Sequence, residues 1–117
     1  MHALIFAALF AGAQPAAELD YQAGSLGYGA LVRGDLATAE KQLLSSREVN
    51  GQDVAWLLNY GQLLARQGRV AEARGVFRRI ERAPDAEVVL SSGHVIGTHE
   101  ASRLASRRLA QQGLSAR

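Results

Sequence analysis

The sequence has no cysteine and few aromatic residues. Its 117 residues include two Pro, one Trp, three Tyr and three Phe. The absence of Cys excludes a disulfide framework and a thiolate zinc site. Because strands favour aromatic and β-branched side chains, the shortage of aromatics and the abundance of Ala favour helices that pack through small residues. The 48% of hydrophobic residues suffices for the core of one ordinary domain.

Lysine is almost absent too, and the charges are unevenly distributed. Residues 1–60 carry three basic and six acidic side chains, a net charge of −3, whereas residues 61–117 carry ten Arg and five acids, a net charge of +5. A basic C-terminal half can bind an acidic partner, a membrane surface or nucleic acid; a solvated arginine face is the plainer interpretation. The candidate basic surface consists of Arg103, Arg107 and Arg108.

The first 17 residues have the pattern of a secretory signal peptide. An apolar run, Ala3–Ala11, leads into the small-x-small site Ala-Gly-Ala at 11–13, although no Lys or Arg precedes the run. The run is too short to span a bilayer, which takes about 20 residues. We expect cleavage after Ala13 or Ala17, a periplasmic or secreted protein without a transmembrane span, and no nucleic acid partner. If this segment is instead the first apolar helix of the fold, the protein is cytoplasmic.

Two stretches, 27–43 and 61–77, repeat one pattern with a period of 34 residues and no gap. The second Gly of each copy lies where a first helix would end, because Gly adopts the left-handed C′ conformation without a Cβ clash. The first Gly and the later Ala lie on opposite helices, where small side chains let two backbones approach. Each copy therefore predicts a helix–turn–helix hairpin. The paired positions are Gly27 and Gly61, Gly34 and Gly68, Ala37 and Ala71, Ala39 and Ala73, and Leu43 and Phe77.

Helical periodicity supports the hairpin in the second copy. Asp53 can cap its first helix and Pro84 ends its second helix. The apolar residues recur at helical spacing on both segments, namely Trp56, Leu57, Tyr60, Leu63 and Leu64 on the first, and Val70, Ala73, Val76, Phe77 and Ile80 on the second.

These residues resemble the tetratricopeptide repeat, whose 34-residue pattern is W-x2-L-G-x2-Y…A-x3-F…P. With repeats at 20–53 and 54–87, the paired Gly, Ala and Leu/Phe positions fall on the family pattern, whereas Trp56 and Pro84 each lie one position early. The resemblance implies a non-enzymatic α-solenoid whose first helices line a concave groove for a protein or peptide. The implied groove positions are Tyr21, Gly24, Tyr28, Leu31 and Val32 in the first copy, and Ala55, Leu58, Gln62, Ala65 and Arg66 in the second.

The resemblance also implies chemistry for some of these side chains. Tyr21 and Tyr28 could stack on a peptide, and Arg66 could pair with a carboxylate. Asn59 matches a position that some family members use to clamp a C-terminal carboxylate, but the first copy lacks the partners of that clamp. Packing against the next helix is the competing interpretation for all of these residues.

The repeat stops after residue 87. Residues 88–98 hold two β-branched runs around Ser-Ser-Gly-His, which predicts a β-hairpin or else an irregular connector. Residues 99–113 return to helical spacing, with an apolar stripe of Ala101, Leu104, Ala105 and Leu109, and with Ser102, Arg103, Ser106 and Arg107 facing away. Thr98 can cap this helix, and residues 114–117 form a tail. We expect the helix at 99–113 to cover the open end of the solenoid, because two repeats are fewer than the usual minimum of about three.

No catalytic, cofactor or metal motif is present. His94 and His99 are neither three nor four residues apart, and no Cys or further His joins them. The sequence thus favours an all-α scaffold or assembly factor of the cell envelope that binds a protein or peptide through the groove. The alternatives are a self-associating structural protein and a binder of acidic surfaces through the arginine-rich C-terminal half.

Overall fold

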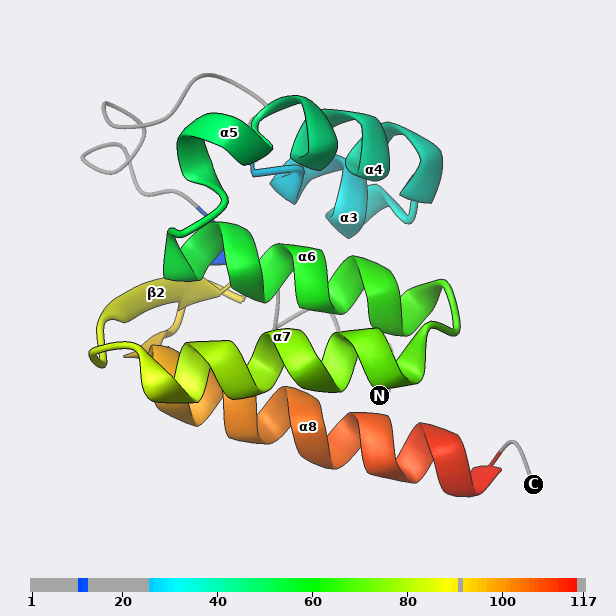
Figure 1. The fold of residues 1–117 in the computed structure, drawn as a ribbon, viewed down its shortest axis with the longest axis vertical. Coiled ribbons are helices and arrows are strands. Elements are labelled where there is room, and N and C mark those ends of the chain that lie inside the picture. The colour runs from blue at the N-terminus through cyan, green and yellow to red at the C-terminus, as the bar shows by residue number, and fades with distance from the viewer. Residues whose placement is uncertain (1–10, 13–25, 91, 116–117) are drawn as a thin grey trace.

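The computed structural model describes residues 11–12, 26–90 and 92–115. Helices dominate it, and a small sheet lies beside them (Figure 1). The all-α fold with two hairpins, a small β-hairpin and a C-terminal helix is confirmed. Tyr21, most of the predicted signal segment and the first residues of the 20–53 repeat lie outside the described residues. The elements in chain order are β1 (Ala11–Gly12), α3 (Tyr28–Arg33), α4 (Leu36–Ser45), α5 (Arg47–Asn50), α6 (Val54–Arg66), α7 (Val70–Arg82), β2 (Glu87–Leu90), β3 (Val95–Gly97) and α8 (Thr98–Ser115).

The first hairpin consists of α3 and α4, and it turns at Gly34. Gly34 has a φ of 79°, so it takes the left-handed conformation that the repeat pattern predicts. Its N–H donates to the carbonyl of Leu31 at 3.0 Å. Asp35 then caps α4, because its Oδ1 accepts from the N–H of Thr38 at 3.1 Å. The turn residues of the first copy therefore end one helix and start the next.

The second hairpin consists of α6 and α7 and shows why the repeat carries its first glycine. Gly61 of α6 lies against the ring of Phe77 on α7, and a Cβ at Gly61 would lie 2.9 Å from Phe77 Cζ. Only hydrogen at this position lets the two helices approach so closely. Asp53 caps α6 as predicted, with its Oδ1 accepting from the N–H of Ala55 at 3.0 Å.

Trp56 joins the two hairpins. Its Nε1 donates to the carbonyl of Leu43 on α4 and to Ser46 Oγ, both at 3.1 Å. The ring stacks on Tyr60 with centroids 4.8 Å apart, and the Arg47 guanidinium of α5 lies 5.9 Å from the Trp56 centroid and 5.4 Å from that of Tyr60. Trp56 therefore bonds to the preceding repeat through its N–H.

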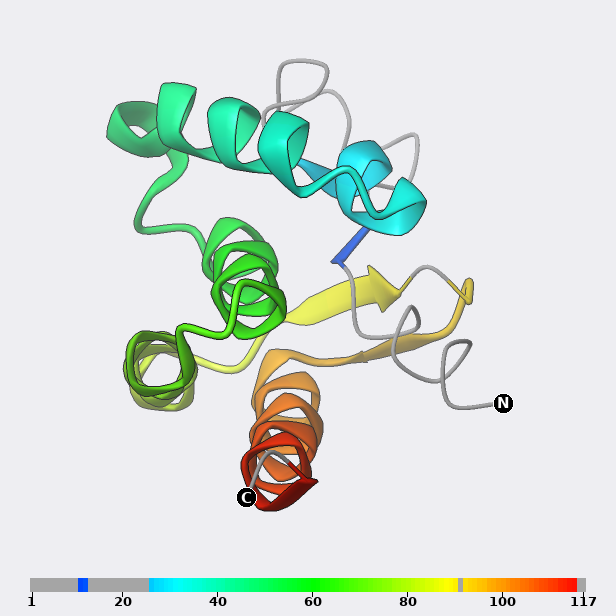
Figure 2. The same ribbon diagram turned by 90° about the vertical axis from the view of Figure 1, so that its right-hand side faces the viewer.

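The sheet has the order β1-β2-β3, and both pairs are antiparallel. The predicted hairpin is formed by β2 and β3, with Val88 opposite Ile96 and Val89 opposite Val95. Strand β1 comes from the segment predicted to be a signal peptide, and its Ala11 lies opposite Leu90. Figure 2 shows the sheet and α7 on opposite sides of α6, with α3 above the sheet, beyond β1, and α8 below it, beyond β3.

Helix α8 packs against α7 and α6 and buries Ala101, Ala105 and Leu109 as predicted. Two details of the prediction are wrong. Ser102 does not face away, because it is fully buried and its Oγ donates to the Phe77 carbonyl at 2.8 Å. Nor does Thr98 supply the cap.

The cap of α8 comes from Asp85, in the segment between α7 and β2. Asp85 Oδ1 accepts from the N–H of His99 at 3.0 Å and from Thr98 Oγ1 at 3.2 Å. The backbone N–H of His99 is the main reason that the pKa of Asp85 lies below its usual value. The polar residue that caps this helix is therefore 14 positions from its hydrogen-bond partner, beyond the reach of a local pattern.

Candidate protein-binding face

The candidate site is the face of the first helices, α3 and α6, that looks away from α4 and α7. We call it the concave face; it includes the groove positions that the family resemblance implies. In this structure the chain's own elements cover much of it. Strand β1 and helix α8 both contact α6, and the side chain of Gln112 on α8 donates to the carbonyl of Ala65 at 2.9 Å.

The predicted groove residues of α6 are closed to a partner in this conformation. Leu58, Asn59 and Gln62 are all buried. Asn59 Nδ2 donates to the carbonyl of Leu26 at 3.0 Å, so its amide holds the residue before the first hairpin rather than a terminal carboxylate. The physical reason is that a buried amide must find a partner, and the backbone of the preceding repeat is the nearest one.

Arg66 also makes a contact within the chain. The side chain is half-buried, and its Nη1 donates to the carbonyl of Leu31 at 2.9 Å. This bond ties the end of α6 to the last turn of α3, where the Leu31 carbonyl also accepts from the N–H of Gly34. The role of Arg66 here is to join adjacent repeats, and sequence reasoning missed it because the accepting carbonyl lies 35 residues away.

Gln62 differs from its neighbours because part of its amide has no partner. The residue is 2% exposed, and Nε2 is the buried side-chain atom without a hydrogen-bond partner among the described residues. Around the axis of α6, Gln62 lies between two neighbouring directions. On one side are Asn59 and Arg66, whose side chains donate to backbone carbonyls at α3; on the other is Ala65, whose carbonyl accepts from α8. By this placement Gln62 points toward the region between α3 and α8.

The concave face retains some accessible surface on α3. Tyr28 is half-buried and packs against the core, and Val32 is 46% exposed although it is apolar. On α5, outside the concave face, Val49 is 86% exposed. These two valines allow the same substitution to be compared on and off the concave face.

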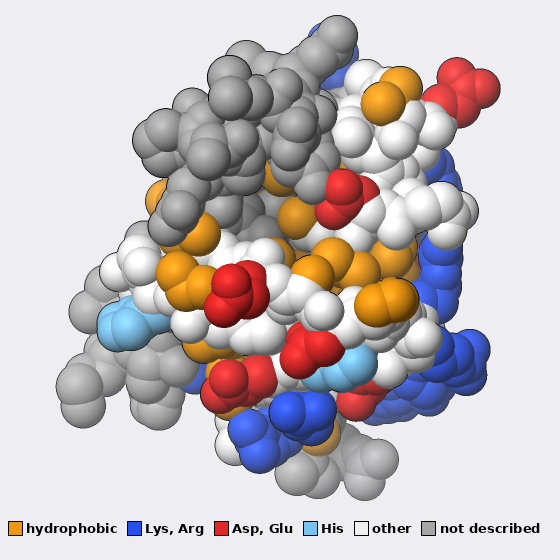
Figure 3. Space-filling view, turned by 90° about the vertical axis from the view of Figure 1, so that its left-hand side faces the viewer, with side chains coloured by type: hydrophobic (Ala, Val, Ile, Leu, Met, Phe, Trp, Pro, Cys, Tyr) orange, Lys and Arg blue, Asp and Glu red, His pale blue; other side chains and the backbone are white. Residues whose placement is uncertain are grey.

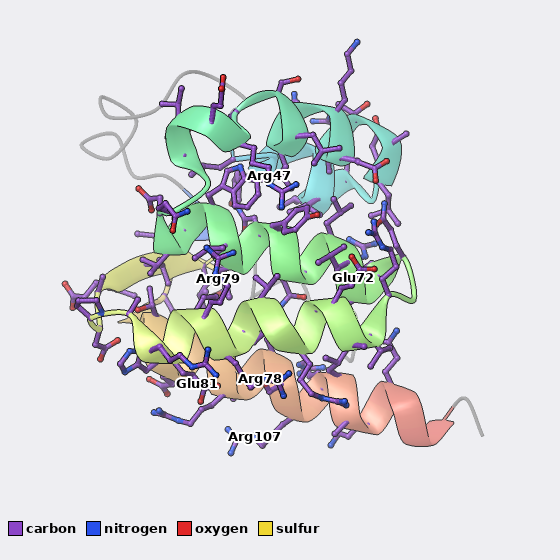
Figure 4. The ribbon with its side chains drawn as sticks, in the orientation of Figure 1. Arg47, Glu72, Arg78, Arg79, Glu81 and Arg107 are labelled. Atoms are coloured by element: carbon purple, nitrogen blue, oxygen red, sulfur yellow. The ribbon has the colours of Figure 1, made fainter. Side chains whose placement is uncertain are left out.

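The arginines of the candidate basic surface differ in exposure, and further exposed arginines lie on α7. Arg103 and Arg107 are exposed, whereas Arg108 is half-buried. Exposed arginines of α7 add to them, with Arg74, Arg78 and Arg82 four residues apart along one helix face. Figure 4 shows Arg78 between α7 and α8 and Arg107 beyond α8, and Figure 3 shows Lys and Arg gathered along one margin of the molecule. The sequence analysis counted these α7 residues in the basic C-terminal half but did not name them as candidate surface residues.

Over residues 11–12, 26–90 and 92–115, no group of three His, Cys, Asp or Glu side chains is placed to hold a metal ion. The same part of the chain has no helix with the length and apolar character that crossing a membrane requires.

Comparison with known protein families identifies the repeat. The family model of the tetratricopeptide repeat matches residues 25–87, which is more than half of the chain. The match includes both hairpins and ends at the first residue of β2. Searches of curated proteins and of solved structures find no match.

Proposed function

Because the chain belongs to the tetratricopeptide repeat family, we propose that it is a non-enzymatic scaffold or assembly factor that binds a protein or peptide in the cell envelope. The observation that carries this proposal is the pair of in-phase hairpins, whose first helices present a common concave face. Repeats of this kind expose a continuous surface for another chain. The envelope location rests on the apolar leader and its small-x-small site.

Affinity capture from envelope extracts of the source cell tests the partner. The tagged full chain is compared with Val32→Asp, which adds a charge to the exposed part of the concave face, and with Val49→Asp, which adds the same charge on α5. We expect a protein that the wild type and Val49→Asp retain and that Val32→Asp loses. Equal retention by all three chains would exclude the concave face as the binding surface.

The location has its own test, which is N-terminal sequencing of the protein recovered from the envelope. We expect the sequence to begin at residue 14 or 18. An intact residue 1 in the envelope fraction would contradict cleavage, and recovery only from the cytoplasm would contradict export.

A second candidate function is binding of an acidic surface, which the exposed arginines of α7 and α8 favour. The test is sedimentation with vesicles that contain anionic lipid. Arg103→Gln/Arg107→Gln is compared with Arg33→Gln/Lys41→Gln, which removes the same charge elsewhere. If this function is correct, binding weakens as salt rises and only the first variant loses it. Self-association is the remaining alternative, and light scattering that shows a stable monomer at micromolar concentration would exclude it.

A further inference from the structure

The two edges of β2 differ in what their backbone groups bind. The N–H of Leu90 donates to the carbonyl of His94 at 2.9 Å, and the carbonyl of Ala86 accepts from the N–H of Thr98 at 2.6 Å. Backbone groups alternate between the two sides of an antiparallel strand. Residues 86, 88 and 90 therefore point toward β3, and the backbone groups of Glu87 and Val89 point toward the opposite edge, where β1 lies.

The strand on that edge is short and comes from a separate part of the chain. Strand β1 has two residues, with Ala11 opposite Leu90 and Gly12 opposite Val89. It belongs to the segment that the proposed export would remove. The side chains of Val88 and Leu90 are 7% and 6% exposed, so β2 is anchored in the core. Loss of β1 would leave an anchored strand with an open edge.

A second observation concerns the helix that β1 contacts, α6. Its Gln62 Nε2 is a buried donor without a partner among the described residues. A buried amide without a hydrogen bond costs about 1–3 kcal/mol, so such groups are rare unless something binds to them. A peptide carbonyl on an extended segment along β2 is an acceptor of suitable chemistry.

From these observations we infer that the edge of β2 and the Gln62 side of α6 form a binding site for an extended segment of a partner protein. The inference rests on the proposed scaffold function and names the partner's chemistry. Backbone pairing with Glu87 and Val89 supplies affinity, as in strand addition to other sheet edges. The segment carries small, uncharged side chains, because Ala11 and Gly12 occupy the place in this structure. Strand β1 occupies this edge until the leader is removed.

The test uses the full chain and a fluorescent peptide with the sequence of residues 8–15, ALFAGAQP. Gly12→Pro removes a backbone donor from β1 and displaces it from Val89. In that background, Val89→Pro disables the open edge of β2, and Val95→Pro is the matched control. Val95 is the register partner of Val89, and its backbone groups point away from β2 at the opposite edge of the sheet. Circular dichroism and urea unfolding establish that each variant is folded.

We expect the peptide to bind Gly12→Pro at least tenfold more tightly than the wild type, in which β1 competes from within the chain. Adding Val89→Pro lowers affinity at least tenfold, and adding Val95→Pro leaves it unchanged. If Val89→Pro fails to fold, Gln62→Leu in the same background provides the second measurement, with an expected loss of about fivefold because a single hydrogen bond is removed. Equal affinity for the wild type and Gly12→Pro, equal effects of the two β-strand prolines, or no effect of Gln62→Leu would overturn the inference.

Failure of this site can be distinguished from failure of the scaffold function. A partner that Val32→Asp loses but that Val89→Pro still captures from envelope extracts refutes the strand site and leaves the scaffold function standing.

Discussion

The contact between Gly61 and Phe77 gives the sharpest test of the repeat packing. Replacing Gly61 with Ala adds a Cβ 2.9 Å from Phe77 Cζ and 3.0 Å from Cδ1, and closer still to Cε1. Phe77 is 1% exposed, so its ring has no solvent to move into. The matched variant is Gly75→Ala on α7 of the same hairpin, where an added Cβ meets nothing within 4 Å.

Two opposing terms set the magnitude. Ala stabilises a helix interior by about 1 kcal/mol relative to Gly, and this term applies at both positions. Overpacking a filled core costs about 1–3 kcal/mol, and it applies at Gly61 alone. Because the ring of Phe77 is confined, we take the upper overpacking cost of about 3 kcal/mol. The helix term returns about 1 kcal/mol of this, so Gly61→Ala should lower the free energy of unfolding by about 2 kcal/mol. Gly75→Ala should raise it by about 0.5–1 kcal/mol.

Urea unfolding followed by far-ultraviolet circular dichroism measures both variants. A change of 2 kcal/mol corresponds to a fall in Tm of about 10 °C for a domain of this size. The variants Phe77→Leu and Gly61→Ala/Phe77→Leu complete a double-mutant cycle. The smaller Leu side chain leaves room for the new methyl group at position 61. We expect the two changes to couple favourably by about 1 kcal/mol. Stabilisation by Gly61→Ala equal to that of Gly75→Ala, or strict additivity in the cycle, would refute the reasoning.

Three further outcomes are expected. The pKa of Asp85 is lowered in the folded state. The stabilising effect of its carboxylate is therefore complete above the unfolded pKa of about 4 and is lost as the pH falls through the lowered folded-state pKa. The difference in unfolding free energy between wild type and Asp85→Asn should shrink accordingly in acid. Gln62→Leu should raise the unfolding free energy by about 1 kcal/mol or more in urea titrations, because it removes an unpaired buried donor. Trp56→Phe should lower it by about 1–2 kcal/mol in the same titrations, since the hydrogen bonds that the Trp56 N–H donates to Leu43 O and Ser46 Oγ are removed.

The sequence was enough to predict the hairpins because their determinants are local. A left-handed Gly such as Gly34 ends a helix wherever it stands, and Asp53 caps the helix that begins one residue later. The close approach at Gly61 could also be predicted, because the 34-residue period pairs it with a position on the next helix. These features depend on spacings that a single repeat contains.

The roles of Asn59, Arg66 and Asp85 could not be predicted in this way. Each makes its bond to a partner 14 to 35 residues away, namely the Leu26 carbonyl, the Leu31 carbonyl and the N–H of His99. A polar side chain on a helix face looks the same in the sequence whether it binds a ligand or an adjacent repeat. Only the packed structure distinguishes the two, because burial forces each group to find a partner.

The shortness of the array explains why so much of the concave face is occupied. Two hairpins leave the outer side of α6 and α7 open, and α8 covers it in the position that a third repeat would take. The chain that follows the repeats also supplies β2 and β3, and residues 11–12, which precede the repeats, supply β1, the strand that contacts α6. Side chains of the concave face such as Leu58 are therefore buried in the core and stabilise the fold. A partner must then bind to the surface that these contacts leave accessible. In this fold that is the α3 end of the face, and under the proposed removal of β1 the edge of β2 joins it, which is why the two proposed variants, Val32→Asp and Val89→Pro, separate the possible binding modes.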